Sequence, residues 1–346
     1  MATTKTVRAG VLGFSGYSGA ELVRLLRRHP QSIPVLLEHR ATSEDERAPW
    51  EDGLERVSFT SAGLAAAPVD VVFTATSAEV ALEAVPLALE AGAKAVDISG
   101  AHRLRTAETQ KRWYGFDHPR PDLLAEASYG LPEFYREQIR GARLVANPGC
   151  YPTAANLSIE PLAAAEVLDR SFGIVCDAKS GVSGAGRKPS AKTHFSQVTE
   201  NFSAYGALFH RHTPEVMQNS GLSEGELFFT AQLLPLHRGI LETIYLRTVN
   251  PMTTDDVVAV LEARYADEPF VRVLPGGELP DLHSVQYTNL CKIGVRADAA
   301  TRRVMLVSVI DNLIKGAAGQ ALQNMNLLFG LDETMGLLNA ADGERP

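Results

Sequence analysis

Residues 7–19 read VRAGVLGFSGYSG, an apolar run followed by a glycine-rich one. Residues 7–12 have the composition of a short buried strand, and apolar side chains at helical spacing indicate a helix from residue 20 to Arg28. Glycines allow a tight turn and let the backbone approach a phosphate that faces the helix N-terminus. An ordinary strand-to-helix turn is the alternative, but the context favours a dinucleotide site. The turn residues expected at the cofactor are Gly13, Ser15, Gly16, Tyr17, Ser18 and Gly19.

Strands and helices continue to alternate up to about residue 98. Buried-strand patterns lie at residues 33–37, 69–75 and 95–98, and a helical pattern covers residues 79–91. This alternation is typical of a Rossmann-type, doubly wound parallel sheet of the α/β class. Residues 43–56 are strongly charged, so we expect a solvated surface loop there.

The pattern changes after residue 150. Longer strands with partial alternation are expected, which favours an α+β domain with a largely antiparallel sheet. A helix rich in small residues is expected at residues 316–325, and another helix at residues 255–264. The expected strands cover residues 172–178, 227–234, 240–249, 291–296 and 304–310.

Composition limits the class of protein. The chain has 346 residues, which suggests two domains, and 45% of them are hydrophobic, which is enough for a sizeable core. A net charge of −8 argues against nucleic-acid binding, and no apolar run reaches membrane-spanning length. Residues 1–8 lack the apolar stretch of a signal peptide, and three cysteines do not make a disulfide framework. We therefore expect a cytoplasmic protein that binds neither nucleic acid nor membrane.

The end of the second expected strand bears on the choice between NAD and NADP. Glu38 is the type of residue that binds the adenosine ribose hydroxyls and keeps NAD open. Arg40, with Ser43 nearby, suits the 2′-phosphate of NADP. Both signals are present, and we favour NADP.

A single cysteine stands out in residues 147–153, which read NPGCYPT. Cys150 follows a Pro-Gly corner, and residues 153–157 have the pattern of a first helical turn, in which a proline is well tolerated. The unpaired N–H groups and positive dipole of a helix N-terminus favour a thiolate there. The alternative is an inert buried cysteine, but this context favours a nucleophile.

Histidines could supply the proton transfer that a catalytic cysteine needs. His210 and His212 flank Arg211 just before an expected helix, and His237 belongs to a second cluster. An extended segment would project His210 and His212 to the same side. No carboxylate or thiol lies near them at metal-ligand spacing, so no metal site is expected.

Two further segments favour anion binding. Residues 180–187 form a second glycine-rich loop that ends at Arg187, a pattern suited to closing over a cofactor or an anionic substrate. Arg103 follows a strand end on the nucleotide side, where it could bind a phosphate through two N–H groups.

These motifs together resemble the N-acetyl-γ-glutamyl-phosphate reductase family, and the resemblance runs almost end to end. The cysteine and C-terminal segments are specific, whereas the glycine loop is not. Two positions depart from the family pattern: Phe14 replaces a small residue, and Ala231-Gln232 stands where relatives often have Pro-His. The segments that carry the resemblance are residues 13–22, 97–104, 129–133, 147–153, 210–215 and 312–320.

The resemblance implies an activity and a set of roles. Cys150 would attack the acyl phosphate, NADPH would reduce the thioester, and His210 would supply the proton, with His212 as second choice. The N–H of Cys150 and its neighbours would stabilise the oxyanion. Substrate contacts would come from Ser99, Arg103, Asn147, Arg187 and His212, and further cofactor contacts from Gly181, Ser183, Gly184 and Asn312.

The resemblance also implies an architecture. Residues 1–149 would form the NADP-binding domain, completed by residues 313–346. Residues 150–312 would form a catalytic and dimerisation domain like that of glyceraldehyde-3-phosphate dehydrogenase. A homodimer or homotetramer is expected on the same ground.

Three alternatives remain open from the sequence. Two are related acyl-phosphate reductases, acting on aspartyl phosphate or on carrier-protein-linked aminoadipyl phosphate. The third is a non-catalytic NADP-binding sensor, which the intact Cys150 disfavours.

Overall fold

The computed structural model describes residues 6–39 and 48–337, and these divide into two units. The first unit contains residues 6–39, 48–111, 116–147 and 317–337, and the second contains residues 112–115 and 148–316. No helix among these residues is both long and apolar enough to cross a membrane.

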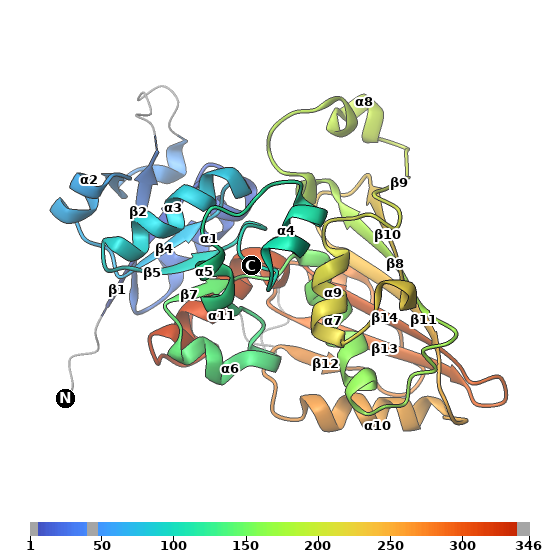
Figure 1. The fold of residues 1–346 in the computed structure, drawn as a ribbon. Helices are drawn as coiled ribbons and strands as arrows, with labels where there is room; N and C mark the ends of the chain where they lie inside the picture. The colour runs from blue at the N-terminus through green and yellow to red at the C-terminus, as the bar shows by residue number, and fades with distance from the viewer. Residues whose placement is uncertain (1–5, 40–47, 338–346) are drawn as a thin grey trace. The chain divides into compact units, whose positions relative to one another are not determined.

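The first unit is built on a seven-stranded sheet with the order β3-β2-β1-β4-β5-β7-β6, in which every neighbouring pair is parallel (Figure 1). The order reverses between β1 and β4, so their carboxyl ends flank a crevice of the kind that binds nucleotides. The strands are β1 (Val7–Leu12), β2 (Ser32–Glu38), β3 (Glu55–Ser58), β4 (Val71–Thr74), β5 (Lys94–Asp97), β6 (Ser128–Tyr129) and β7 (Leu144–Ala146).

The helices of this unit include one that comes from the far end of the chain. Helix α11 is buried along its whole length and packs on α1, α6 and β5. Helix α4 is divided between the two units after residue 111. The helices are α1 (Tyr17–Arg28), α2 (Ser61–Ala66), α3 (Ala78–Glu90), α4 (Ala107–Tyr114), α5 (Pro121–Glu126), α6 (Pro132–Gly141) and α11 (Gly319–Leu328).

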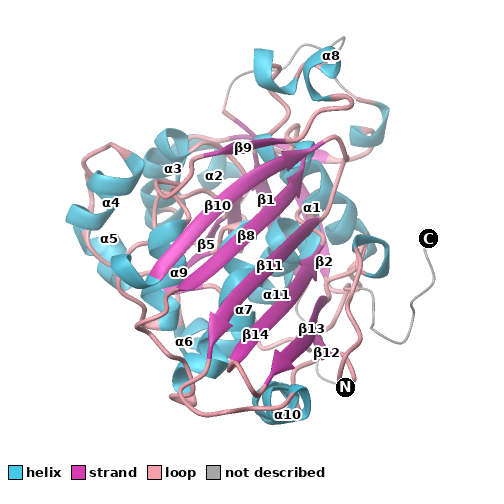
Figure 2. Cartoon of the chain, turned by 90° about the vertical axis from the view of Figure 1, so that its right-hand side faces the viewer, coloured by secondary structure: helices cyan, strands magenta, loops and turns pink. Residues whose placement is uncertain are grey.

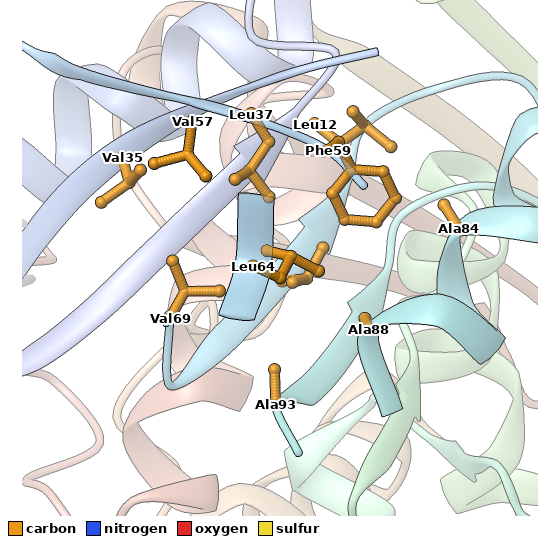
Figure 3. Close-up of a cluster of buried hydrophobic side chains, with 11 residues drawn as sticks. Leu12, Val35, Leu37, Val57, Phe59, Leu64, Val69, Ala84, Ala88 and Ala93 are labelled. Atoms are coloured by element: carbon orange, nitrogen blue, oxygen red, sulfur yellow. The ribbon is translucent and has the colours of Figure 1, made fainter. Parts of the chain in front are cut away.

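One core cluster fixes the strands that lead to the nucleotide turn (Figure 3). Leu12, at the end of β1, is 1% exposed and packs with side chains from β2, β3, α2 and α3. Because β1 is anchored to its last residue, the turn that begins at Gly13 leaves the sheet at a defined point. The labelled members of the cluster are Leu12, Val35, Leu37, Val57, Phe59, Leu64, Val69, Ala84, Ala88 and Ala93.

The second unit contains a mixed seven-stranded sheet with the order β12-β13-β14-β11-β8-β10-β9. Four neighbouring pairs are antiparallel, while β8 with β10 and β12 with β13 are parallel. The strands are β8 (Ile174–Gly181), β9 (Ser203–Tyr205), β10 (Leu227–Leu234), β11 (Ile240–Arg247), β12 (Val271–Val273), β13 (Cys291–Asp298) and β14 (Arg303–Ile310).

Helices cover one face of this second sheet, and the other face is open toward the viewer in Figure 2. Residues of β11 alternate accordingly, with Ile240, Glu242 and Ile244 buried and Tyr245 44% exposed. The helices are α7 (Cys150–Ala164), α8 (Phe195–Val198), α9 (Thr213–Ser220) and α10 (Thr254–Tyr265).

The predicted α/β class, with a doubly wound parallel sheet and a second α+β domain, is confirmed. One local prediction is wrong at its end, because residues 55 and 56 of the expected loop at 43–56 begin the edge strand β3. Only Val57 of its four residues is buried, so the strand carries too little apolar signal to be recognised. Arg56 stabilises it by pairing with Glu38 and Glu51.

A second difference lies at the small-residue helix predicted for residues 316–325. The chain first makes a π-helical turn, Ile314–Ala318, and only then enters α11. A π-turn leaves no trace in a hydrophobic pattern whose period is 3.6 residues.

Candidate active site

The glycine-rich turn has the backbone geometry that a phosphate requires. Gly13 has φ +85°, and a Cβ there would collide with the carbonyl oxygen of Ala75. A Cβ on Gly19 would overlap the carbonyl oxygen of Gly13. Gly16 caps α1 without a side-chain hydrogen bond, so the first N–H groups of the helix face the turn. The predicted strand, turn and helix are therefore present, with α1 beginning at Tyr17.

A cavity of about 340 Å³ lies beside this turn and extends to the end of β2. Its lining includes Ser15 on one side and Glu38 on the other. The Glu38 carboxylate is paired with Arg56, whose guanidinium stacks 5.4 Å from the ring of Phe14. Phe14, the departure from the family pattern, thus supports the arginine that holds Glu38. Arg40 and Ser43 lie outside the described residues.

Asp97, which the sequence did not single out, organises the loop after β5. Its Oδ1 accepts hydrogen bonds from the Thr74 hydroxyl (2.7 Å) and the Ser99 N–H (2.9 Å), and its Oδ2 lies 2.8 Å from Nδ1 of His102. Burial alone would raise the pKa of Asp97, but the hydrogen bond and charge of His102, with Thr74 and Ser99, lower it to about 2. Asp97 is therefore an anion that fixes the shape of residues 99–102.

His118 packs against this loop, with its ring 5.0 Å from that of His102. Its pKa is lowered to about 4, first by burial and then by the neighbouring His102. Its Nδ1 accepts a hydrogen bond from the N–H of Arg120.

Arg103 and Asn147 lie together in the first unit. Arg103 is 8% exposed, and its Nε and Nη2 donate to the carbonyl oxygens of Asn147 (2.8 Å) and Ile98 (2.7 Å). The Asn147 side chain donates to Ala317 O (3.2 Å) and accepts from Asn324 (3.0 Å). Arg103 therefore braces the carboxyl ends of β5 and β7, whatever else it binds.

Cys150 is the first residue of α7, with Gly149 as the N-cap. Gly149 has no side chain that could accept from the first N–H groups of the helix, and Cys150 is half-buried. The thiol therefore lies at a helix N-terminus, as predicted, where the dipole favours its ionised form. Cys176 and Cys291 are fully buried, and the pKa of the Cys176 thiol is raised by burial and by Glu242.

A cavity of about 1210 Å³ in the second unit brings Cys150 together with both predicted histidines. The cationic side chains of Lys192 and Arg211 also line it, and so does Tyr205. The cavity thus brings a thiol at a helix N-terminus together with histidine and tyrosine side chains and two cationic groups.

His210 and His212 lie edge to face, with ring centroids 4.8 Å apart, and the ring of Tyr151 is 5.6 Å from His210. Burial, with the charge of Arg211, lowers the pKa of His210 to about 4. Nδ1 of His210 accepts a hydrogen bond from the backbone N–H of His212 (3.2 Å). The neutral ring therefore carries its proton on Nε2.

The second glycine-rich loop is tied to the C-terminal motif. Asn312 accepts a hydrogen bond from Gly239 N (2.7 Å) and donates to the hydroxyl of Ser183 (3.0 Å). The carbonyl oxygen of Gly239 also accepts a hydrogen bond from Gly181 N (2.9 Å). Gly184, in the same loop, lines the Cys150 cavity. Arg187 is exposed and does not line the cavity.

The structure places many of the predicted residues in three groups, while Gly181, Ser183 and Asn312 are joined through Gly239 and Arg187 stands apart. The glycine turn forms one, Ser99 with Arg103 and Asn147 another, and Cys150 with the histidines and Gly184 the third. Tyr205 and Lys192 were missed, because they carry no motif and reach the cavity through the fold. Asp97 had a signal, since an acidic residue ends a buried strand there.

Comparison with known proteins places this site in a family. Residues 8–142 match the family model described as the NAD binding domain of semialdehyde dehydrogenase, and residues 150–312 match its dimerisation domain. The N-acetyl-gamma-glutamyl-phosphate reductase of Symbiobacterium thermophilum is 49% identical, covering 97% of this chain and 98% of the relative. The chain belongs to the N-acetyl-gamma-glutamyl-phosphate reductase family. This confirms the resemblance inferred from the sequence.

Other members of the family are nearly as similar. The reductase of Magnetococcus marinus is 44% identical over 96% of this chain and 97% of its own length. Solved structures share the fold at lower identity, among them aspartate semialdehyde dehydrogenase II of Vibrio cholerae. Its TM-score is 0.69 at 18% identity, over 94% of this chain and 98% of that chain.

Proposed function

We propose that this chain catalyses the NADPH-dependent reduction of N-acetyl-γ-glutamyl phosphate to N-acetylglutamate 5-semialdehyde, with release of phosphate, in arginine biosynthesis. The observation that carries the proposal is Cys150 at the N-terminus of α7, in one cavity with His210, in a member of this reductase family. The sensor alternative would require this nucleophile to be idle.

The first half of the reaction makes a thioester. The Cys150 thiolate attacks the acyl carbon, a C–S bond forms, and the bond from carbon to the phosphate oxygen breaks with its electron pair leaving on phosphate. The N–H groups at the start of α7 support both the thiolate and the oxyanion. Lys192 and Arg211 give the cavity the positive charge that an acyl phosphate needs.

The second half releases the aldehyde. NADPH, when bound, supplies a hydride to the thioester carbon. Cys150 then leaves as the thiolate, which restores the free enzyme. His210 is neutral and carries its proton on Nε2. This N–H donates a hydrogen bond to the thioester carbonyl oxygen while negative charge develops on that oxygen.

The residues present fit NADPH. The turn at Gly13 and Gly19 is a cradle in which a Cβ would clash, and it opens at the N-terminus of α1. Because Arg56 already holds the Glu38 carboxylate, Glu38 is less available to a ribose hydroxyl, which supports NADP over NAD. Residues proposed to hold the cofactor are Gly13, Ser15, Gly16, Tyr17, Ser18, Gly19, Arg40, Ser43, Gly181, Ser183, Gly184 and Asn312.

We assign the substrate contacts to Ser99, Arg103, Asn147, Arg187 and His212. Ser99 is supported because Asp97 fixes its loop, and His212 because it lines the cavity of Cys150. Nε and Nη2 of Arg103 already donate to the carbonyl oxygens of Asn147 and Ile98. Arg103 would therefore bind the substrate in addition to these two hydrogen bonds.

We also propose that the chain forms a homodimer, or a tetramer built from such dimers, through the open face of the second sheet. Val175, Phe228 and Tyr245 are direct neighbours across β8, β10 and β11, and their side chains are 38%, 47% and 44% exposed. These apolar side chains lie within the segment matched by the dimerisation-domain model.

The test is the reverse reaction. Purified chain is given NADP⁺, N-acetylglutamate semialdehyde and phosphate, and the formation of NADPH is followed by absorbance. We expect phosphate-dependent activity that Cys150→Ala abolishes. Activity only with aspartate semialdehyde or a carrier-linked substrate would replace the substrate assignment, and activity retained in Cys150→Ala would refute the cysteine mechanism.

A further inference from the structure

Gly316 lies against Cys150, the proposed nucleophile, although it comes 166 residues later in the chain. A Cβ placed on Gly316 would be 2.8 Å from the Cβ of Cys150 and 3.3 Å from its Cα. Carbon atoms that are not bonded do not approach that closely, so any other residue here would displace Cys150 or the turn that carries Gly316.

The π-helical turn Ile314–Ala318 places Gly316 against Cys150. Gly316 N donates to Asp311 O (2.9 Å), the i→i−5 bond that widens the turn. Asp311 is fully buried, and its Oδ2 accepts from Arg238 (3.1 Å) and from Tyr287 N (2.7 Å). The turn is therefore anchored to a buried ion pair, and Oδ1 of the same Asp311 also accepts from Leu313 N and Ile314 N at the start of the turn.

A second contact holds the residue before Cys150. The Glu215 side chain is fully buried, and its Oε2 accepts a hydrogen bond from Gly149 N at 2.9 Å. Gly149 is the N-cap of α7, so this bond fixes the backbone at the point where Cys150 enters the helix. Glu215 lies in the first turn of α9, three residues after His212, which is the N-cap of that helix. One short helix start thus carries both a predicted histidine and the acceptor that holds the cysteine corner.

We infer that Gly316 and Glu215 are positioning residues for Cys150. Glu215 holds the amide that precedes the cysteine, and Gly316 sets how far its Cα–Cβ bond can move. Together they keep the thiol at the N-terminus of α7 and in the cavity that it shares with His210. The inference rests on the proposed function, because it gives a purpose to the placement of Cys150 only if Cys150 is the nucleophile.

The Glu215 pair of variants separates positioning from mere packing. Glu215→Gln keeps an oxygen that can accept from Gly149 N, whereas Glu215→Leu leaves a buried N–H without an acceptor. We expect Glu215→Gln to recover most of kcat and Glu215→Leu to lower kcat by about 10-fold or more, with little change in KM. The pH midpoint for alkylation of Cys150 by iodoacetamide should rise in Glu215→Leu only, because the thiol moves from the helix N-terminus.

Gly316→Ala tests the second contact, with Gly141→Ala as the matched control. Gly141 ends α6, and a Cβ there would meet no atom within 4 Å. We expect Gly316→Ala to lower kcat by about 10- to 100-fold with KM nearly unchanged, since a shift of about 1 Å at a nucleophile has an effect of this size. Gly141→Ala should behave as the native chain.

Two results would overturn the inference. One is Gly316→Ala with native kcat and native Cys150 alkylation, and the other is Glu215→Gln and Glu215→Leu behaving alike in both assays. If Gly316→Ala does not fold, the Glu215 pair still decides. Failure of the proposed function looks different, because the native chain itself would then show neither turnover nor selective alkylation of Cys150 ahead of Cys176 and Cys291.

Discussion

His210 differs from a free histidine in two respects that bear on catalysis. Burial and Arg211 lower its pKa to about 4, so the ring is neutral at neutral pH. The hydrogen bond from His212 N to Nδ1 then leaves the proton on Nε2. A ring in this state acts as a hydrogen-bond donor to a developing oxyanion more readily than as a base toward the Cys150 thiol.

Substitution should distinguish the three histidines. We expect His210→Ala to lower kcat by about 10²- to 10³-fold, the usual effect of removing one hydrogen-bond donor to an oxyanion. His212→Ala should mainly raise KM, because we assign His212 to the substrate. His237 is exposed and does not line the Cys150 cavity, so His237→Ala should keep native kinetics. Steady-state kinetics of the three variants is the measurement, and a large kcat loss in His237→Ala alone would contradict the assignment.

His118 should make the stability of the fold depend on pH. Its pKa is about 4 in the folded chain but about 6.5 when unfolded, so between these values the unfolded chain binds a proton that the folded chain does not. The contribution of His118 to the free energy of unfolding is therefore complete above pH about 6.5 and decreases as the pH falls toward about 4.

His118→Asn isolates this effect, because asparagine can still accept from Arg120 N but does not titrate. The urea concentration at the unfolding midpoint should be lower at pH 5 than at pH 7. This decrease should be larger in the native chain than in the variant. Equal falls in both proteins would show that His118 does not titrate in this window.

At the scale of elements, the nucleotide turn depends on how closely α1 approaches the end of β1. A Cβ on Gly19 would overlap Gly13 O, whereas one on Gly16 would lie 3.4 Å from the same oxygen, which is ordinary contact. Gly19→Ala should therefore weaken NADPH binding strongly, and Gly16→Ala much less. Fluorescence titration with NADPH measures both, and equal affinities would contradict the close-approach argument.

The sequence predicted those elements whose signal is local. The strands at residues 7–12 and 227–234 were recognised at their bounds, because continuous or alternating apolar residues mark a buried strand. The edge strand β3 was missed, since three of its four side chains face solvent to some degree. The π-turn before α11 was missed because a wider turn leaves no mark in a hydrophobic pattern of period 3.6.

The candidate site shows the same division. Cys150 and His210 could be proposed from motifs, because a Pro-Gly-Cys corner and a His-Arg-His run are visible in the sequence. That both line one cavity could not be, since spacing along the chain does not give distance in space. The bond from Gly149 N to Glu215 joins residues 66 apart and follows only from the way α9 packs on α7.

At the scale of the whole molecule, the open sheet face predicts the oligomeric state. Phe228 is 47% exposed on the face that we assign to the dimer. Phe228→Asp would place a charge in that apolar contact, so we expect dimers to give way to monomers. Light scattering coupled to size exclusion measures the mass, and Phe195→Asp on α8, where the side chain is 80% exposed, serves as the control away from that face. A native mass for Phe228→Asp would remove this face from the interface.

Helix α11 closes the core of the first unit, although residues 148–316 of the second unit precede it in the chain. Asn324 donates hydrogen bonds to the carbonyl oxygen of Gly130 and to the side chain of Asn147. Asn326 forms a hydrogen bond with the ring of His29, so α11 is bonded to three segments from the first half of the chain. The ribosome makes these partners between 177 and 297 residues before the residues of α11 that bind them. The first unit therefore cannot complete its core until the second unit has been synthesised, because the apolar face that α11 covers stays open until then.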